Sequence, residues 1–433
     1  MIVQLQSQSK AIKRLLRPQQ ERADASYRNA TWTVETEKDG KKYIYNVLTK
    51  GFVCVQNYDD SDKTELISRW FLVEIGFDEF EYVRQIKDFL RLMSSQNQGI
   101  QNYTIFTTTT CNARCYYCFE KDRLACVMTT EKCRQIVDFI RHNSHDQDIT
   151  IRWFGGEPLM NCGAIDNICA GLKENGIQYR STITTNGYLF AGNIVNKAIK
   201  HWNLKKAQIT LDGTERKYNE IKSYVHPDAN PFVTVMGNIE NLVANDVAVL
   251  IRLNMSLENV EDLCQLVSLI HEKFGENKLL KIGVCSIFEL RNDANGESLD
   301  KGLRQIQDLI YKYNLDVSYE YFAKNRINHC QADDHGHSVV IFPDGNIGWC
   351  EHEMGGPYVW NVEKSNLPEE SLTTCPHEYM VFEKCHRCAL YPDCLKLASC
   401  DQNHTCLDFR MQYELRQLLN TMRRMIDRHE TKV

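Results

Sequence analysis

Residues 103–118 read YTIFTTTTCNARCYYC, a run of apolar and Thr residues that ends in three closely spaced cysteines. The β-branched and aromatic side chains favour a strand over 103–109. Cys111, Cys115 and Cys118 follow directly with the spacing C-x3-C-x2-C. The stretch therefore predicts a strand whose carboxyl end carries a group of thiols.

Five further strand-like runs alternate with helical segments along the chain. They are ITIRWF at 149–154, YRSTITT at 179–185, KAQITL at 206–211, VAVLIRLN at 247–254 and LLKIGVCSI at 279–287. Nearly continuous apolar strands joined by helices indicate a parallel sheet buried on both faces. Six such units make an open version of the eight-unit barrel, in which chemistry sits at the carboxyl ends of strands. The sequence therefore predicts an α/β fold with a partial (β/α)6 barrel over 96–300.

Two smaller domains are expected on either side of this barrel. The polar, Gln- and Arg-rich start, 1–30, predicts a poorly ordered arm or a short surface helix. It leads into strand-like and helical runs that predict a small α+β domain over 1–95: TWTVETE at 31–37, KYIYNVL at 42–48, GFVCV at 51–55, and helices at 61–71 and 77–93. A charged helix near 303–313, a cysteine-dense tail and a final helix at 409–430 make up the third domain, 301–433.

Composition narrows the class of protein. With 433 residues and 43% hydrophobic content, the chain can build cores, which excludes disorder as its main state. Lys and Arg number 51 against 57 Asp and Glu, so no basic excess predicts a nucleic-acid partner. No signal-peptide core and no apolar run of about 18 residues is present, so we expect a soluble, cytoplasmic protein without membrane contact.

Eighteen cysteines are unusual for such a protein, because stable disulfides are rare in a reducing cytosol and clustered thiolates there often bind metal. Seven are scattered singly and are expected to be small buried hydrophobes. Structural zinc normally has four protein ligands, so three thiols on one loop indicate a metal centre with an open position. A 4Fe-4S cluster held through three irons fits this description, and zinc remains the alternative.

Two motifs together resemble the radical S-adenosylmethionine (SAM) superfamily. Tyr117 completes the signature C-x3-C-x-aromatic-C, and FGGEP at 154–158, after the second strand, is similar to the GGEP motif. The resemblance implies a cluster on the three cysteines and SAM bound near Gly155, Gly156 and Glu157. Glu157 could instead be an anion in the first turn of a helix.

The resemblance extends to the other strand ends. It implies a polar site for SAM built from Tyr117, Thr185, Asn186, Asp212, Arg252 and Asn254. Arg252 could pair with the SAM carboxylate, or could form an ordinary surface salt bridge. The family often has a His-Asp-like pair and an Arg where this chain has Tyr218, Asn219 and Lys222, so these three are not assigned to the site.

The tail has its own cysteine pattern. Taken alone, CHRCALYPDC at 385–394 favours a zinc ribbon. The whole tail resembles the SPASM extension of peptide-modifying radical SAM enzymes, because Cys330, Gly345 and Cys350 match C-x(9 to 15)-G-x4-C. This resemblance implies two auxiliary 4Fe-4S clusters, and hence three clusters in all. The implied ligands are Cys385, Cys388, Cys394 and Cys406 for the outer cluster, and Cys330, Cys350 and Cys400 for the inner one, with Cys375 as candidate fourth ligand. The spacing before Cys400 departs from the family's usual one.

The implied activity is radical chemistry on a peptide. In such enzymes a 5'-deoxyadenosyl radical abstracts hydrogen from an unactivated carbon, and the cofactor carries that step. We expect a maturase that installs a crosslink in a ribosomally made precursor peptide, with a Cys-to-carbon thioether preferred. Carbon-carbon or carbon-oxygen cyclisation, and formylglycine formation of the anaerobic sulfatase-maturase type, are alternatives. A zinc-ribbon interaction scaffold is the alternative from another class.

Three further assignments follow from the resemblance. Glu351, directly after Cys350, stands where relatives carry an acidic general base, although it could be a plain solvated acid. The domain over 1–95 resembles a leader-recognition element, whose exposed strand edge would capture the leader of the precursor peptide, or it is a structural cap. Flavodoxin or ferredoxin is the expected electron donor.

Overall fold

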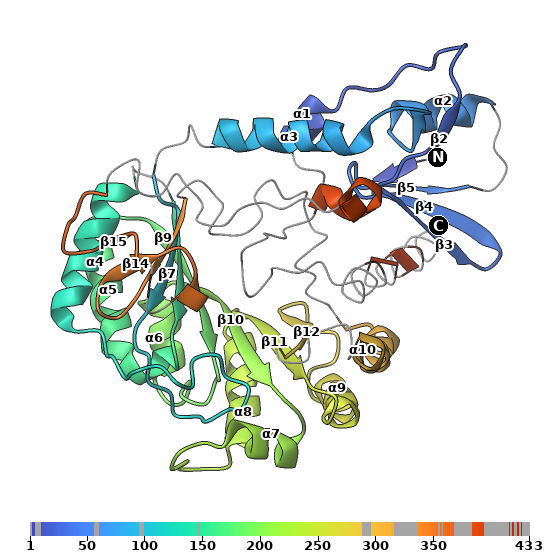
Figure 1. Ribbon diagram of the computed structural model, residues 1–433. Coiled ribbons are helices and arrows are strands. Elements are labelled where there is room, and N and C mark those ends of the chain that lie inside the picture. Colours follow the sequence, from blue (N-terminus) through green and yellow to red (C-terminus); the bar gives the residue numbers. More distant parts are fainter. Residues whose placement is uncertain are drawn as a thin grey trace. The chain divides into compact units, whose positions relative to one another are not determined.

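The structure is a computed structural model. It describes residues 2–4, 10–55, 60–94, 99–144, 148–287, 296–315, 337–353, 356, 358–367, 383–393, 415, 418, 419, 422, 423 and 426. These fall into two compact units (Figure 1). Unit 1 combines residues before 97 with residues after 376, and unit 2 combines 97–318 with 331–376. The three-part division at 95/96 and 300/301 stays a prediction.

Unit 2 contains the six predicted strands in the predicted order. They are β7 (Asn102–Phe106), β8 (Ile149–Phe154), β9 (Tyr179–Thr185), β10 (Leu204–Leu211), β11 (Ala248–Met255) and β12 (Leu280–Ser286). Each pairs with the next in parallel, so their carboxyl ends meet at one edge of the sheet. The α/β fold with a mostly parallel sheet is confirmed.

Helices connect these strands and lie along the outer side of the sheet (Figure 1). They are α4 (Thr130–Asn143), α5 (Cys162–Glu174), α6 (Ile194–Lys200), α7 (Glu215–Lys222), α8 (Pro231–Ala244) and α9 (Val260–Phe274), with the short η1 (Pro158–Asn161) before α5. The charged helix expected near 303–313 is α10 (Gly296–Lys312). No helix among the described residues is long and apolar enough to span a bilayer.

The expectation that the strands are buried on both faces is wrong for the middle of the sheet. Burial alternates in β8, where Ile151 and Trp153 are fully buried and every second residue, Thr150, Arg152 and Phe154, is partly exposed. An open barrel covers only its outer face with helices, so the inner face keeps polar side chains. The partly exposed inner-face residues are Arg152, Thr182, Thr184, Gln208, Thr210, Arg252 and Asn254.

The tail contributes strands that were not predicted. β13 (Ser338–Ile341) pairs in parallel with β7, and β14 (Asn346–Gly348) and β15 (Trp360–Asn361) continue the sheet antiparallel. Gly345 closes the β13–β14 turn at φ +86°, a conformation that favours glycine. Short apolar runs between cysteines are hard to distinguish from loops by periodicity, which is why these strands were missed.

Unit 1 is built on a four-stranded sheet of the described strands, in the order β1-β5-β4-β3. Three strands, β3 (Thr33–Lys38), β4 (Lys41–Asn46) and β5 (Gly51–Cys54), match the predicted runs. Three helices accompany them: α1 (Lys10–Leu15), α2 (Asp60–Ser68) and α3 (Glu79–Ser94). β2 (Tyr27–Asn29) pairs with β6 (Leu72–Glu74).

The predicted disordered or surface arm is wrong in part. β1 (Ile2–Gln4) pairs with β5, and Ile12 of α1 is buried in the core of unit 1. A few apolar residues in a polar segment are enough to join a core that other segments supply.

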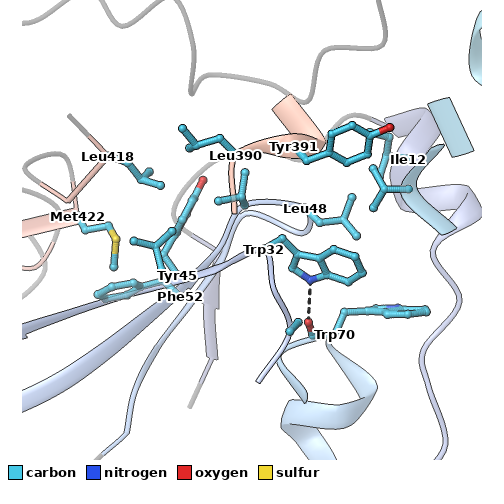
Figure 2. Packing of buried hydrophobic residues seen from close by; sticks show 14 of the residues in the cluster. Ile12, Trp32, Tyr45, Leu48, Phe52, Trp70, Leu390, Tyr391, Leu418 and Met422 are labelled. Carbon is cyan, nitrogen blue, oxygen red and sulfur yellow. Dashed lines mark hydrogen bonds between the residues drawn. The ribbon is translucent and has the colours of Figure 1, made fainter. Parts of the chain in front are cut away.

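Both ends of the described chain share this core. Trp32, Tyr45 and Phe52 from the N-terminal strands pack in one cluster with Leu390, Tyr391, Leu418, Met422 and Ile426 (Figure 2). The Trp32 indole N–H donates to the carbonyl oxygen of Trp70 at 3.1 Å. A buried ion pair joins Lys50 to Asp393, and the Lys87 ammonium donates to the Tyr391 carbonyl at 3.0 Å. The small N-terminal domain is therefore completed by a segment about 300 residues later in the chain.

Candidate functional site

The loop after β7 carries the three predicted cluster ligands. Cys111, Cys115 and Cys118 are each partly buried. The backbone N–H of Ala113 donates to Sγ of Cys111 at 3.4 Å, and that of Glu120 donates to Sγ of Cys118 at 3.4 Å. Such donors stabilise thiolates and are present before any ligand binds.

These thiols would need a cationic partner to ionise at neutral pH. Burial, together with the charge of Glu157, raises the pKa of Cys111 to about 12, and burial also raises the pKa of Cys118. Alone, these groups would stay protonated at neutral pH, whereas a cationic centre releases their protons. Within the described residues no three His, Cys, Asp or Glu side chains converge enough to hold one metal ion. The fit to an iron-sulfur cluster therefore rests on the thiols, their loop and the backbone donors.

The two glycines after β8 allow the cysteine loop to pack closely. Gly155 has φ +126°, and a Cβ at Gly156 would lie 2.4 Å from the Thr110 carbonyl oxygen. The N–H of Gly156 donates to the Thr108 carbonyl at 3.1 Å. The glycines thus fix the position of the loop, and their predicted contact with SAM stays a prediction.

Glu157 is fully buried, and its carboxylate is hydrogen-bonded to other residues of the protein. Its carboxylate accepts hydrogen bonds from the N–H of Leu159 at 3.0 Å, the hydroxyl of Thr185 at 2.8 Å and the N–H of Asn186 at 2.8 Å. Burial raises its pKa to about 6, although these donors oppose the shift. Glu157 also caps the start of η1, which fits the alternative that it is an anion at the beginning of a helix. Glu157 therefore ties the end of β8 to the end of β9.

Thr185 and Asn186 lie at the end of β9, as predicted. The side-chain amide of Asn186 donates to Asn112 of the cysteine loop at 2.7 Å, so this strand end also supports the loop. On β11, Arg252 donates to the side-chain oxygen of Asn254 at 3.0 Å. Among the described residues no carboxylate pairs with Arg252, so the surface salt bridge is not seen. A role of this guanidinium in holding the SAM carboxylate stays a prediction.

Asp212 and Tyr117 form a buried group with a residue that the sequence analysis left out. The Tyr117 hydroxyl donates to both carboxylate oxygens of Asp212, at 2.8 and 2.9 Å. The Lys222 ammonium lies 3.0 Å from Asp212 and 3.3 Å from the Tyr117 hydroxyl. A sequence signal was available, because Tyr218, Ile221 and Lys222 share one buried face of α7 at helical spacing.

Glu351 follows β14 and is paired. Its carboxylate accepts from Arg152 at 3.1 Å, and its carbonyl accepts from Arg123 at 3.0 Å. Burial would raise the pKa of Glu351, but the Arg152 charge and hydrogen bond outweigh it, so the net pKa is lowered. Arg123 also pairs with Glu120 at 3.1 Å, and burial raises the Glu120 pKa to about 7. This partly buried network links the cysteine loop to the segment of Cys350.

The predicted tail ligands are divided between the two units. Cys350 belongs to unit 2, whereas Cys385 and Cys388 lie in or beside the short helix η7 (Glu383–Arg387) of unit 1. The N–H of Cys388 donates to the Cys385 carbonyl at 3.2 Å, which brings the two residues together in one turn. The remaining predicted ligands lie outside the described residues: Cys330, Cys375, Cys394, Cys400 and Cys406.

Comparison with known proteins agrees with this geometry. Residues 105–270 match the Radical SAM superfamily. GTP 3',8-cyclase of Clostridium perfringens (strain 13 / Type A) is 31% identical over 293 residues, 62% of this chain and 85% of the cyclase. Radical SAM cyclopropyl synthase TigE of Paramaledivibacter caminithermalis is 21% identical over 326 residues, 62% of this chain and 69% of the synthase. Native anSMEcpe with bound AdoMet and Cp18Cys peptide shares the fold at TM-score 0.60 and 15% identity, covering 77% of this chain and 100% of that chain.

A partial barrel with a thiol loop at its strand ends is an enzyme architecture in which a cofactor binds at those ends. The chain belongs to the radical SAM superfamily. The predicted resemblance to this superfamily and the prediction of an enzyme are confirmed. Members of the superfamily bind SAM and carry a 4Fe-4S cluster, for which the cysteine loop has the fitting residues.

Proposed function

We propose that this enzyme is a maturase that crosslinks a ribosomally synthesised precursor peptide, with a Cys-to-carbon thioether as product. The observation that carries the proposal is the cysteine loop at the carboxyl ends of six parallel strands, above a polar inner face. When bound, the cluster and SAM supply a 5'-deoxyadenosyl radical that abstracts hydrogen. Cys111, Cys115 and Cys118 would hold the cluster.

The surrounding residues would bind and orient SAM. Arg252 and Asn254, at the end of β11, would hold its carboxylate through charge-assisted hydrogen bonds. Tyr117 would line the same site, and Gly155 and Gly156 would let the loop approach closely. Glu157 and Asp212 would support the SAM site indirectly. Their hydrogen bonds to Asn186 and Tyr117 would keep the strand ends and the loop in place.

The proposed substrate class is supported by the relatives. The solved structure of anSMEcpe contains a bound peptide, and TigE is a cyclopropyl synthase. In this chain Glu351 would be the general base that accepts the substrate proton. It is ionised in the ion pair with Arg152, and its lowered pKa makes it a weaker base than a free carboxylate. An electron carrier, flavodoxin or ferredoxin, would reduce the cluster.

The first test measures SAM cleavage. The triple variant Cys111→Ala, Cys115→Ala, Cys118→Ala should release no 5'-deoxyadenosine after dithionite reduction, because the cluster loses its ligands. Cys126→Ala is the matched control, since this partly buried cysteine closes the same loop outside the triplet. Cleavage at the parent rate by the triple variant would refute the proposal.

The second test concerns the leader of the precursor peptide. β3 is an edge of the described sheet, and the two-residue turn Asp39-Gly40 joins it to β4. In such a hairpin the pair next to the turn, Lys38 with Lys41, is hydrogen-bonded, and the next pair, Glu37 with Lys42, is not. The N–H of Glu37 therefore points away from β4. Glu37→Pro would remove this donor, and Glu37→Ala would keep it. We expect the Pro variant alone to weaken leader binding in calorimetric titration, and equal affinities would refute capture at this edge.

The SPASM assignment and its two auxiliary clusters are a further part of the proposal. Three clusters would give about twelve iron atoms per chain. Cys388→Ala should lower the iron content, retain SAM cleavage and yield no crosslinked peptide, because the auxiliary clusters would accept the electron released when the new bond forms. Normal product from this variant would refute their role.

A second candidate substrate is a nucleotide, because the cyclase relative is 31% identical over 85% of its length. Analysis of the reaction products separates the peptide from the nucleotide as substrate. Crosslinking removes two hydrogen atoms from the peptide and blocks its thiol against alkylation, whereas nucleotide chemistry would consume GTP without any peptide.

A further inference from the structure

A buried asparagine joins two strand ends at the carboxyl edge of the barrel sheet. Asn259 lies directly before α9 and is 1% exposed. Its side-chain amide donates to the backbone carbonyl of Asp212, after β10, at 2.9 Å, and to that of Asn254, on β11, at 3.0 Å. Its side-chain oxygen accepts from the N–H of Ser256 at 2.7 Å. This one amide therefore bonds to the ends of both β10 and β11.

The place of Asn259 in the chain would ordinarily give its side chain another partner. It is the N-cap residue of α9, where an Asn side chain usually accepts from N–H groups of its own helix, yet here it makes no such bond. Asp262, in the first turn of α9, also bonds across to the loop after β10. Its carboxylate accepts from the N–H and the hydroxyl of Thr214, at 2.6 and 2.8 Å. The start of α9 thus holds strand ends in place instead of capping itself.

One of the carbonyls that Asn259 holds belongs to a residue proposed to bind SAM. The side-chain oxygen of Asn254 accepts from Nε of Arg252 at 3.0 Å. Both residues lie at alternate, partly exposed positions of β11, on the inner face of the sheet. Asn259 therefore fixes the backbone from which the Asn254 side chain projects, and that side chain orients the guanidinium. Without the amide, two carbonyls and one N–H at these strand ends lose a partner, which is costly for buried groups.

We infer that Asn259 is a positioning residue, which holds the end of β11 so that Arg252 and Asn254 meet the carboxylate of SAM. The inference rests on the proposed function, because it requires SAM at these strand ends. Asn259 acts through Arg252, and none of its covalent bonds changes. The adenosine part of SAM carries no carboxylate. Loss of the Asn259 amide should therefore weaken binding of the amino-acid part selectively.

The experiment measures binding of two ligands by equilibrium dialysis. SAM is compared with 5'-methylthioadenosine, which keeps the adenosine and the sulfur but lacks the carboxylate and the amino group. The proteins are the full-length parent, Asn259→Ala and Asn259→Asp, each reconstituted with iron and sulfide. Asn259→Asp keeps an acceptor for Ser256 but loses the amide donor. Both variants should lower the preference for SAM about tenfold, roughly the contribution of one charge-assisted hydrogen bond.

Asn143→Ala is the matched control, because Asn143 is a buried amide of the same unit with the same bonding pattern. It donates to the carbonyls of Phe139 and Ser365 at 2.7 and 2.8 Å, and it accepts from the N–H of Leu367 at 3.2 Å. It ends α4 and contacts the chain just before β7, so it lies at the amino ends of the strands. Its loss should lower stability and leave the preference for SAM unchanged.

A double variant tests whether Asn259 acts through Arg252. Asn259→Ala added to Arg252→Ala should change the preference for SAM by less than about twofold, because the contact that Asn259 positions is already gone. A residue that only stabilises the fold would show no such dependence on Arg252. A further tenfold loss of preference in the double variant would overturn the inference.

The remaining outcomes separate this inference from the function on which it rests. If Asn259→Ala and Asn259→Asp keep the parent's preference for SAM, the inference alone is overturned. If only Asn259→Asp folds, its preference decides. If neither folds, Asn259 serves stability, and the inference fails. A parent that binds 5'-methylthioadenosine as tightly as SAM would instead contradict the SAM site of the proposed function, and the inference would fall with it.

Discussion

We expect Lys50→Met to destabilise unit 1 strongly while leaving unit 2 intact. Lys50 is fully buried and forms an ion pair with Asp393, which is 4% exposed. Methionine keeps the length of the side chain but leaves a buried carboxylate without its counter-ion. Breaking a buried pair from one side costs about 3 to 5 kcal/mol. At about 1.4 kcal/mol per factor of ten, the open state of unit 1 becomes about 100-fold to several thousand-fold more populated.

Hydrogen exchange followed by mass spectrometry measures this change within the full chain. Amides of β4 and β5 should lose protection by that factor, whereas those of β9 and β10 in unit 2 serve as the internal reference. Lys42→Met is the matched control, because Lys42 pairs with Glu35 on the exposed surface of the same sheet. Such an exposed pair contributes about 0.2 to 1 kcal/mol.

A second variant tests the cause of the effect. Lys50→Met/Asp393→Leu replaces both charges by apolar groups and should recover most of the protection, because a buried pair replaced as a whole is often neutral or stabilising. If Lys50→Met loses no more protection than Lys42→Met, the segment around Asp393 is not part of the core of unit 1, and the reasoning fails.

Three further predictions concern unit 2. Gly156→Ala should displace the cysteine loop, because the new Cβ would lie 2.4 Å from a loop carbonyl oxygen, and the iron bound at the loop should fall. Gly163→Ala is the control and should leave the iron content unchanged, because its nearest contact would be at 3.9 Å. Glu157 has a pKa raised from 4.5 to about 6, so the folded form holds its proton longer and stability falls by about 2 kcal/mol as pH rises through that window. Glu157→Gln should flatten this part of the urea-unfolding profile against pH. Arg252→Ala should weaken SAM binding in equilibrium dialysis by about 1.5 to 3 kcal/mol, unlike the exposed Arg216→Ala.

The barrel could be predicted from sequence because its strands carry local signals. Each run from 103–109 to 279–287 is apolar and β-branched, and each is followed by a helix with its own apolar face. Parallel order then follows from the helical connections, and the thiol loop has to lie at the carboxyl ends. The β13–β14 hairpin was missed, although the sequence FPDGN at 342–346 is a recognisable turn between two apolar runs.

The roles of the polar residues could not be predicted in the same way. Motif resemblance identifies the positions of Glu157 and Asp212 but not their partners. It does not show that Thr185 donates to Glu157, or that Tyr117 and Lys222 contact Asp212. Those partners lie on other strands and helices, so no local pattern relates them. The same holds for unit 1, where no periodicity in the sequence connects β4 with residues near 390.

Unit 1 is assembled from both ends of the chain, and this determines when it can fold during synthesis. Lys87 and the Tyr391 carbonyl that it contacts are 304 residues apart. At a synthesis rate of about 5 to 20 residues per second, the ribosome needs about 15 to 60 s to deliver the second after the first. During that interval Trp32, Tyr45 and Phe52 lack the part of their cluster that comes from the end of the chain, including Leu390 and Leu418. The strands of the barrel, which need no later segment to pair with one another, are complete well before, so the first domain to emerge is the last to close.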